Sequence, residues 1–269
     1  MNKLRVVLFE TPHDPFYSMA YEEAFTRVRS KNLTDDTLRI FRHRDSVIIG
    51  YFQYAENEVN LEIAKSMNIM VARRFTGGGA VFHDLGNMNY AFAFKGKIGN
   101  VDNIYRTYVK GALNALKYLG VDATVQNVND IVINNYKVSG TAASIRWNTG
   151  FIHGAMLVKT DLNKLAGVLK VSKKKLEDKN ISDVKYRVIN LSDFLKRDID
   201  YSEIIYALVK GFSDFLEMEY YYDGPTKEEL DVTDILYKWK YSKEEWNLKR
   251  TPFSYYNDLE EKIEEVLKK

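Results

Sequence analysis

The order in which strand-like and helix-like segments occur constrains the fold of this sequence more than any other feature. Short apolar runs rich in β-branched and aromatic residues, such as 4–9, 46–51 and 151–158, fill much of the first part of the chain and predict strands. Helices are predicted among them at 17–30, 60–67 and 102–119, and the chain from residue 161 onward is mostly helical in pattern. Strands clustered first and helices later predict an α+β fold with a mixed or mostly antiparallel sheet and flanking helices.

Two pairs of neighbouring apolar runs predict hairpins. The runs 38–42 and 46–51 are joined by the short polar turn 43–45. The runs 80–83 and 88–94 predict a second pair of strands. The last of these runs alternates aromatic residues with alanines, so we expect one aromatic face and one face of small residues.

Composition narrows the functional classes. The sequence has no cysteine, which excludes a disulfide framework, a thiolate metal site and a cysteine nucleophile. Its net charge of +2 is close to balanced, whereas nucleic-acid-binding domains are usually more basic, so no nucleic-acid partner is expected. No secretory signal is visible at the N-terminus and no apolar run approaches membrane-spanning length. We therefore expect a cytoplasmic protein without a membrane partner.

Residues 73–84, RRFTGGGAVFHD, give the strongest indication of a binding site. Three consecutive glycines allow positive φ angles and close approach of the backbone to a ligand. Exposed N–H groups in such a loop can hold an anion, and the preceding arginines suit phosphate. A tight turn beside two surface arginines is the commoner explanation of a glycine triplet considered alone. The loop is neither a Walker A motif nor a dinucleotide-binding fingerprint, because the spacing differs from both.

A lysine beside small residues marks a second segment, residues 129–142, NDIVINNYKVSGTA. The pattern predicts strand, turn and strand, with Asn134 and Asn135 in the turn. Lys137 opens the second strand, where little side-chain bulk surrounds it, so it can reach a phosphate or carboxylate as a point charge. Considered alone, Lys137 is more often an ordinary solvated hairpin lysine.

Two of the four histidines, His83 and His153, fall in the candidate segments. They could be metal ligands, but the sequence offers no cluster of partners for them. A neutral imidazole readily donates one hydrogen bond and accepts another, so both are predicted to be hydrogen-bonded structural residues.

Together these segments resemble the lipoate–protein ligase A family of the biotin/lipoate ligase superfamily. The resemblance rests on Arg-Arg-x-x-Gly-Gly-Gly-Ala-Val-Phe-His-Asp-Leu-Gly-Asn at 73–87, Asn-Asp at 129–130, Lys-Val-Ser-Gly at 137–140 and His-Gly at 153–154. Their order and spacing agree with the family, and weaker similarity covers most of residues 4–195. The resemblance implies a catalytic domain related to biotin ligases and to class II synthetase cores.

The resemblance also implies a two-step reaction that uses ATP, with Mg²⁺ as the expected companion of the nucleotide. Lipoate attacks the α-phosphate to give lipoyl-AMP and pyrophosphate. The ε-amine of an acceptor lysine then attacks the activated carbonyl and releases AMP.

Family roles transfer onto matching positions of this sequence. Lys137 is implied as the catalytic residue, because a cation there would reach both the lipoyl carbonyl oxygen and the α-phosphate. The nucleotide-binding candidates are Arg74, Gly79, Ala80, Val81, Phe82 and Lys137. The lipoate-binding candidates are Lys137, Arg73, Gly78, His83 and His153. Gly77, Asn129 and Asp130 complete the set, the last two as candidates for a cation near the phosphates.

The chain is expected to hold a catalytic domain at residues 1–250 and a charged helical tail at 251–269. Single-chain bacterial ligases continue into an accessory domain, which we expect a separate subunit to supply here, as in archaeal two-component ligases. The resemblance implies acceptors of two kinds: lipoyl domains of 2-oxoacid dehydrogenase E2 components and the glycine-cleavage H protein.

Three alternatives share features with this interpretation. Transferases of the same fold that carry the acyl group on a cysteine are excluded by the lack of cysteine. A lipoyl or octanoyl transferase that takes preformed lipoyl-AMP stays open. So does a non-catalytic subunit that binds lipoate or nucleotide. The arginine–glycine loop of biotin ligases differs from 73–79. The sequence does not distinguish lipoate from octanoate as the preferred acid.

Overall fold

The computed structural model describes residues 3–96, 99–170 and 187–268, and these residues form two sheets and their flanking helices. In spatial order the larger sheet contains β11 (Tyr220–Asp223), β1 (Leu4–Val7), β2 (Thr37–Phe41), β6 (Asn87–Phe94), β10 (Thr149–Leu157), β9 (Tyr136–Arg146), β8 (Asp130–Ile133) and β7 (Thr124–Gln126). The strands β11, β1 and β2 are parallel, and the remaining pairs are antiparallel. The prediction of an α+β fold with a mixed, mostly antiparallel sheet is confirmed.

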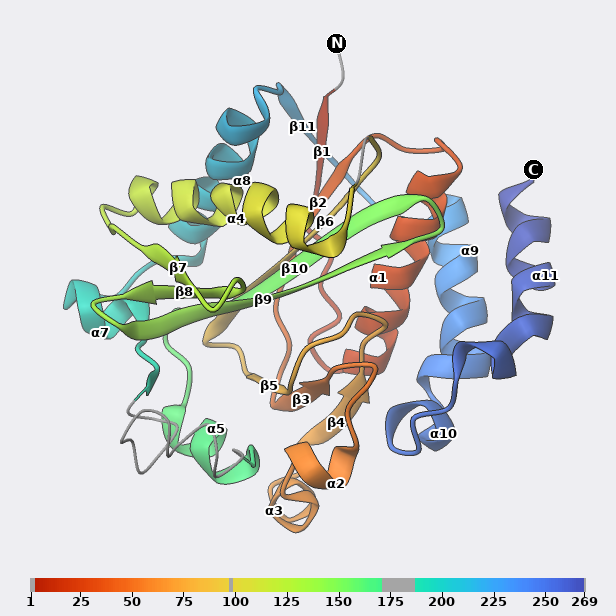
Figure 1. Cartoon of the computed structure of the whole chain (residues 1–269), viewed down its shortest axis with the longest axis horizontal. Coiled ribbons are helices and arrows are strands. Elements are labelled where there is room, and N and C mark those ends of the chain that lie inside the picture. Colours follow the sequence, from red (N-terminus) through yellow and green to blue (C-terminus); the bar gives the residue numbers. More distant parts are fainter. Residues whose placement is uncertain (1–2, 97–98, 171–186, 269) are drawn as a thin grey trace.

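Helices cover both faces of the larger sheet (Figure 1). On one face lie α4 (Val101–Tyr118) and α8 (Tyr201–Leu216), packed against each other. On the other lies α1 (Pro15–Ser30), with α9 (Lys227–Leu236) and then α11 (Asn257–Leu267) outside it. The shorter helices are α2 (Ala55–Glu58), α3 (Leu61–Ser66), α5 (Leu162–Val168), α7 (Leu191–Leu195), the π-helical η2 (Tyr237–Tyr241), α10 (Glu244–Asn247) and the 3₁₀-helical η3 (Phe253–Tyr256).

The smaller sheet has the order β4 (Met70–Arg73), β3 (Ser46–Ile49) and β5 (Val81–His83) and lies below the larger one in Figure 1. The two predicted hairpins are therefore wrong, because β2 and β3 lie in different sheets, as do β5 and β6. The strand β3 pairs parallel to β4 and antiparallel to β5. Both turns carry the chain from one sheet to the other.

Strand β6 separates two kinds of core. Its aromatic side chains Tyr90, Phe92 and Phe94 pack against α4 and α8, as the alternation predicts. Ala91 and Ala93 face α1 on the opposite side. Because these alanines are small, α1 can lie close to the sheet, and this helix brings polar side chains to the site described below.

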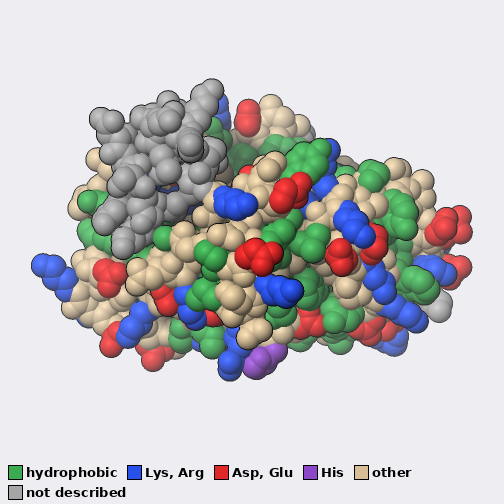
Figure 2. Space-filling model, turned by 90° about the horizontal axis from the view of Figure 1, so that it is seen from below, with side chains coloured by type: hydrophobic (Ala, Val, Ile, Leu, Met, Phe, Trp, Pro, Cys, Tyr) green, Lys and Arg blue, Asp and Glu red, His purple; other side chains and the backbone are tan. Residues whose placement is uncertain are grey.

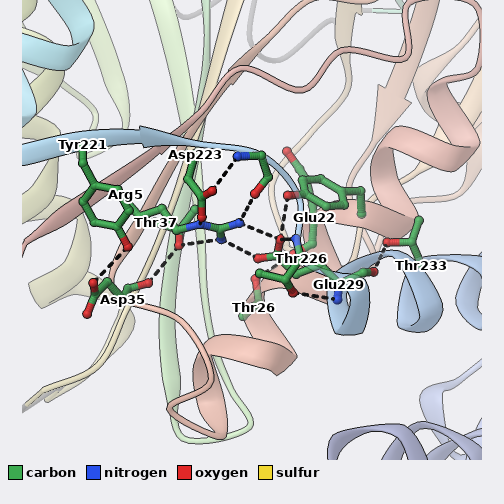
Figure 3. A network of polar contacts seen from close by, with 12 residues as sticks. Arg5, Glu22, Thr26, Asp35, Thr37, Tyr221, Asp223, Thr226, Glu229 and Thr233 are labelled. Carbon is green, nitrogen blue, oxygen red and sulfur yellow. Dashed lines mark hydrogen bonds and ion pairs between the residues drawn. The ribbon is translucent and has the colours of Figure 1, made fainter.

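A buried arginine fastens the N-terminal strand to the C-terminal helices (Figure 3). The Arg5 guanidinium donates to Glu229 Oε1 at 2.7 Å and to Asp223 Oδ2 at 2.8 Å, and so joins β1 to β11 and α9. Thr226 caps α9 in a reciprocal capping box with Glu229. Tyr21 of α1 donates from its hydroxyl to Glu229 Oε2 at 3.1 Å, so residues far apart in the sequence hold α9 against α1.

On the face shown in Figure 2, Lys and Arg side chains are interspersed with Asp and Glu. Charge is therefore mixed on this face, in keeping with the nearly balanced composition. Among residues 3–96, 99–170 and 187–268, no helix is both long and apolar enough to cross a membrane.

Candidate active site

The predicted segments meet on one face of β9 and β10. Gly140, Ala142, His153 and Ala155 share this face, because His153 is in register with Ala142 and Ala155 with Gly140. The same rows continue into β6, where Ala91 is in register with His153. Mostly small side chains thus form the floor of the site, which leaves room above the sheet.

The glycine loop lies over this floor. Gly78 has a φ of +89°, which favours glycine, and a Cβ built there would lie 3.7 Å from the Cβ of Ala142. Gly50, at the end of β3, meets the loop from the other side. A Cβ on Gly50 would come within 1.9 Å of the Gly78 carbonyl oxygen. The loop therefore lies between Gly50 and the strand that carries Ala142, and only glycine fits at Gly50 and Gly78.

Arg74 holds the loop from inside. Its Nη2 donates to the carbonyl oxygens of Gly77 and Gly79, at 2.7 and 2.8 Å, and its Nη1 donates to Ile48 at 3.0 Å. Burial lowers the pKa of Arg74 to about 10, and the guanidinium stays charged at neutral pH. These contacts turn loop carbonyls inward, toward the arginine, so the arginine sets the shape of the loop.

Arg73 is anchored away from the loop. Its guanidinium donates to the carbonyl oxygens of Gly50, Gln53 and Trp246, with distances of 2.9, 2.6 and 2.8 Å. Burial lowers the pKa of Arg73 to about 10. Its side chain therefore ties the end of β4 to the C-terminal α10.

Lys137 lies at the start of β9, beside the loop. Its Nζ is 2.8 Å from where a Cβ of Gly140 would stand, and it forms a 2.6 Å ion pair with Asp130 on β8. Gly140 and Ala142 are two residues apart on one strand face, about 7 Å. The ammonium of Lys137 and the loop at Gly78 are therefore neighbours above the same strand.

Asn129 stiffens the base of this hairpin. Its Nδ2 donates to the Thr141 carbonyl oxygen at 3.1 Å, and its own carbonyl oxygen accepts from the Thr141 backbone and hydroxyl. The turn that follows uses Asn134 and Asn135 with positive φ, as the sequence predicts. Within the described parts of the chain, no group of three or more His, Asp or Glu side chains is placed to hold a metal ion.

His83 pairs with a second histidine. The Nδ1 atoms of His83 and His43 are 3.0 Å apart, so one ring donates and the other accepts. Burial lowers the pKa of His83 to about 3, with further contributions from His153 and Arg74, and burial also lowers that of His43. Both rings are therefore neutral at physiological pH, as expected for hydrogen-bonded structural histidines.

The segment after the glycines enters β5. Val81 and Phe82 pair with Ile48 and Val47 of β3, and the Phe82 side chain is fully buried in the core of the smaller sheet. Ala80 precedes the strand, and its N–H donates to a carboxylate oxygen of Glu58 at 3.2 Å. A negatively charged group therefore already lies at a loop N–H group.

His153 links the loop to α1. Its Nδ1 lies 3.0 Å from Glu22 Oε2, and its Nε2 lies 2.8 Å from Thr76 Oγ1. Neither Glu22 nor Thr76 was predicted from the sequence as a site residue. Two adjacent glutamates in a helix usually face solvent. The one sequence signal was that apolar and small residues surround Glu22 and Glu23 on both sides.

Comparison with known proteins identifies the family of this chain. Residues 14–213 match the model of the lipoyl protein ligase A/B catalytic domain family. The chain is 40% identical to lipoate-protein ligase A subunit 1 of Thermoplasma acidophilum over 255 residues, which cover 91% of this chain and 96% of that protein.

Two solved structures are similar over almost the whole chain. One, from the bi-partite lipoate protein ligase and E2 lipoyl domain system of T. acidophilum, has a TM-score of 0.86 at 39% identity, covering 94% of this chain and 98% of that one. The other, a lipoate-protein ligase A bound with ATP, has a TM-score of 0.84 at 38% identity, covering 93% and 100%.

Proposed function

The chain belongs to the family of lipoyl protein ligase A/B catalytic domains, and on that premise we propose that it is an ATP-dependent lipoate–protein ligase. The proposal draws on its similarity to a lipoate-protein ligase subunit and to a ligase structure with bound ATP. The position of Lys137 beside the glycine loop is the observation that carries it, because one cation then serves both reacting groups.

In the first step, a carboxylate oxygen of lipoate attacks the α-phosphorus of ATP, and the bond to pyrophosphate breaks. Lys137 draws the two anions together and stabilises the charge that develops on the phosphoryl oxygens. Its ion pair with Asp130 holds the ammonium over Gly140 until the substrates arrive. Lys137 then shares its three donors between Asp130 and the substrate oxygens.

In the second step, the neutral ε-amine of an acceptor lysine attacks the carbonyl carbon of lipoyl-AMP. An amide bond forms, AMP leaves with the bonding electron pair, and the amine proton is released. Lys137 stabilises the oxyanion on the carbonyl, because this oxygen lies next to the phosphate that it already contacts.

The glycine loop supplies the nucleotide site in this proposal. Gly79, Ala80, Val81 and Phe82 contribute backbone groups, and the N–H of Ala80 exchanges the Glu58 carboxylate for a substrate oxygen. Arg74 fixes the conformation of the loop by donating to the carbonyl oxygens of Gly77 and Gly79. Arg73 serves further away, by anchoring the loop's first residue to α10.

The lipoyl chain lies along the floor of small residues. Lys137 lies over Gly140, and the row from Ala142 to His153 and Ala91 continues under α1. His83 bounds the same interior from β5, within electrostatic reach of His153.

The residues beside Lys137 fit Mg²⁺. Asp130 and Asn129 offer hard oxygen donors, and Mg²⁺ typically takes one or two carboxylates together with phosphate oxygens and water. When bound, the ion would neutralise phosphate charge. Asp130 would hold it while still orienting Lys137.

We propose that residues 1–250 are the catalytic domain, that 251–269 pack on it, and that a second subunit completes the enzyme. The relative named subunit 1 and the bi-partite system support the last point. An E2 lipoyl domain is the first acceptor to test, because the bi-partite relative was solved as a system with one.

The test is formation of lipoyl-AMP and pyrophosphate from lipoate, ATP and Mg²⁺ by the purified chain, compared with Lys137→Ala. We expect the variant to lose at least about 100-fold in rate, the scale of one lost transition-state donor. Lys210→Ala is the matched control, because Lys210 forms a similar surface ion pair, with Asp214, on α8.

If the chain forms no lipoyl-AMP, preformed lipoyl-AMP and an E2 lipoyl domain are added. Transfer at that stage would support a transferase or a ligase that needs its second subunit. Equal rates for Lys137→Ala and the wild type would contradict the role given to Lys137.

A further inference from the structure

We propose that Glu22 and Thr76 are positioning residues of this site, which act through His153 to fix the hydrogen-bonding state of Arg74 and hence the glycine loop. The inference rests on the proposed function and deepens it. Neither residue is among the ligand-binding residues that the family resemblance implies. The path runs from α1, through β10 of the larger sheet, to the glycine loop between β4 and β5 of the smaller sheet.

The first observation is the unusual environment of Glu22. In the described part of the chain three glutamate side chains are fully buried: Glu22, Glu23 and Glu229. Glu229 pairs with Arg5, and Glu23 pairs with Arg27 and Lys240. Among the described residues, the carboxylate of Glu22 accepts hydrogen bonds only from His153, at 3.0 and 3.2 Å.

Burying a carboxylate lowers the stability of the fold unless the charge is paired and hydrogen-bonded. Packing alone therefore does not explain a glutamate at this position. The negative charge of Glu22 acts on two buried arginines, Arg39 and Arg74, and of these Arg74 holds the glycine loop. Burial lowers the pKa of Arg74 to about 10, and the negative charge of Glu22 is the largest influence that opposes this shift. Glu22 therefore helps to keep the loop-organising guanidinium charged.

The second observation is that the hydrogen bonds have one consistent direction. A carboxylate only accepts, so His153 Nδ1 must donate to Glu22. With the ring proton on Nδ1, Nε2 accepts from the hydroxyl of Thr76, which is fully buried. Thr76 Oγ1 in turn accepts from Arg74 Nε at 3.0 Å. Every donor in the series has an acceptor.

The opposite tautomer of His153 breaks this arrangement. If Nε2 carried the proton, the Thr76 hydroxyl would accept from both His153 and Arg74 and would lose the acceptor for its own proton, while Nδ1 would present a lone pair to Glu22. Two acceptors would then face each other inside the protein, which costs about 1–3 kcal/mol per unsatisfied group. Glu22 thus selects the tautomer in which the Thr76 hydroxyl donates to His153 while its oxygen accepts from Arg74.

The consequence reaches the ligand through the loop. Arg74 holds the carbonyl oxygens of Gly77 and Gly79, and the Thr76 carbonyl oxygen accepts from Tyr51 N–H at 2.8 Å. A rotation of Arg74 would release both glycine carbonyls and let the loop N–H groups turn. We therefore expect Glu22 and Thr76 to affect binding of the nucleotide.

Two pairs of variants test the proposal. Thr76→Val and Glu22→Leu remove the hydroxyl or the acceptor, whereas Thr76→Ser and Glu22→Gln retain an oxygen at the same place. In lipoyl-AMP formation we expect the first pair to lose about 10- to 100-fold in kcat/KM for ATP, as typical for supporting contacts. The loss should lie mainly in the KM for ATP, and the second pair should stay within about threefold of the wild type.

Thr233→Val is the matched control. Thr233 is also fully buried and donates to a backbone carbonyl oxygen, that of Glu229, but it lies on α9. It should lose thermal stability to the same extent as Thr76→Val without a change in the KM for ATP. If Thr76→Val resembles this control in its kinetics, the positioning role is wrong.

Nuclear magnetic resonance of ¹⁵N-histidine-labelled protein gives a readout that does not depend on activity. Four histidines occur in the chain, and His153→Gln identifies the signal of His153. We expect the proton on Nδ1 in the wild type and on Nε2 in Glu22→Leu. A proton on Nε2 in the wild type would overturn the proposal. An inactive wild type with the proton on Nδ1 would instead contradict the proposed function.

Discussion

At the scale of single residues, the site depends on backbone positions that few side chains tolerate. Gly78 combines a positive φ with contact on both sides, from Arg74 and Ala142. A binding loop at the glycine triplet and the arginines before it could be predicted from the sequence, because glycine readily adopts the positive φ that such loops need. The contacts of Arg74 could not, because sequence does not tell whether an arginine faces a ligand or its own loop.

Gly78→Ala tests whether the loop geometry matters beyond its strain. A Cβ would meet Arg74 Nη2 at 2.8 Å, and the positive φ costs an alanine about 1–2 kcal/mol. Gly120→Ala is the matched control, because Gly120 has a φ of +74° and open space around it. We expect both variants to lose stability in urea unfolding, Gly78→Ala the more because of its contact with Arg74, but a tenfold or greater loss of kcat/KM for ATP in Gly78→Ala alone. Equal kinetics for the two variants would argue against a ligand-binding loop.

At the scale of elements, α1 determines what surrounds the site. Its N-terminus is set by Asp14, which caps it, and by Pro15 in the first turn. The helix is buried almost all around, so the adjacent Glu22 and Glu23 face opposite partners: His153 at the site and Lys240 in the C-terminal helices. Helix position was predictable from periodicity, whereas these partners come from segments more than 130 residues away.

The C-terminal helix α11 packs through an apolar stripe although its composition is highly charged. Leu259, Ile263 and Leu267 are buried, and Glu260 pairs with Arg27 of α1 at 2.6 Å. The many charges predict a surface helix. The apolar residues at helical spacing were the signal in the sequence that one side of this helix packs on the protein.

Ile263→Ala tests whether 251–269 stabilise the catalytic domain. Because Ile263 is fully buried, truncation should lower the free energy of unfolding by about 2–4 kcal/mol. Glu261→Ala, on the exposed side of the same helix, should change it by less than about 0.5 kcal/mol. Thermal unfolding of both variants is the measurement. If Ile263→Ala left the free energy of unfolding unchanged, residues 251–269 would not stabilise the catalytic domain.

At the scale of the whole molecule, the α+β class followed from the order of segments, but the division into two sheets did not. Short turns such as 43–45 look like hairpin connections, yet β2 finds parallel and antiparallel partners in β1 and β6 instead. Burial of both faces of β2 outweighs the local preference for a hairpin. Each site segment could be identified from the sequence. That these segments meet on β9 could not, because it depends on the division of the strands between two sheets.

Acid stability tests how tightly the C-terminal helices are joined to the rest. Burial alone would raise the pKa of Glu23, but Lys240 and Arg27 overcome it and lower that pKa from 4.5 to about 2. A carboxyl with a depressed pKa stabilises the fold above about pH 4.5, and this stability is lost as the pH falls toward 2. Its full contribution is roughly 3 kcal/mol, of which about 2 is lost by pH 3.

Glu23→Gln should therefore lie further below the wild type in urea unfolding at pH 6 than at pH 3, by about 2 kcal/mol. The difference arises because only the wild type takes up a proton at this site as it unfolds in that range. Glu265→Gln, an exposed change on α11, should track the wild type at both pH values. A gap between Glu23→Gln and the wild type that does not change with pH would mean that Glu23 acts through packing. The ion pair with Lys240 would then not be what couples α1 to the C-terminal helices.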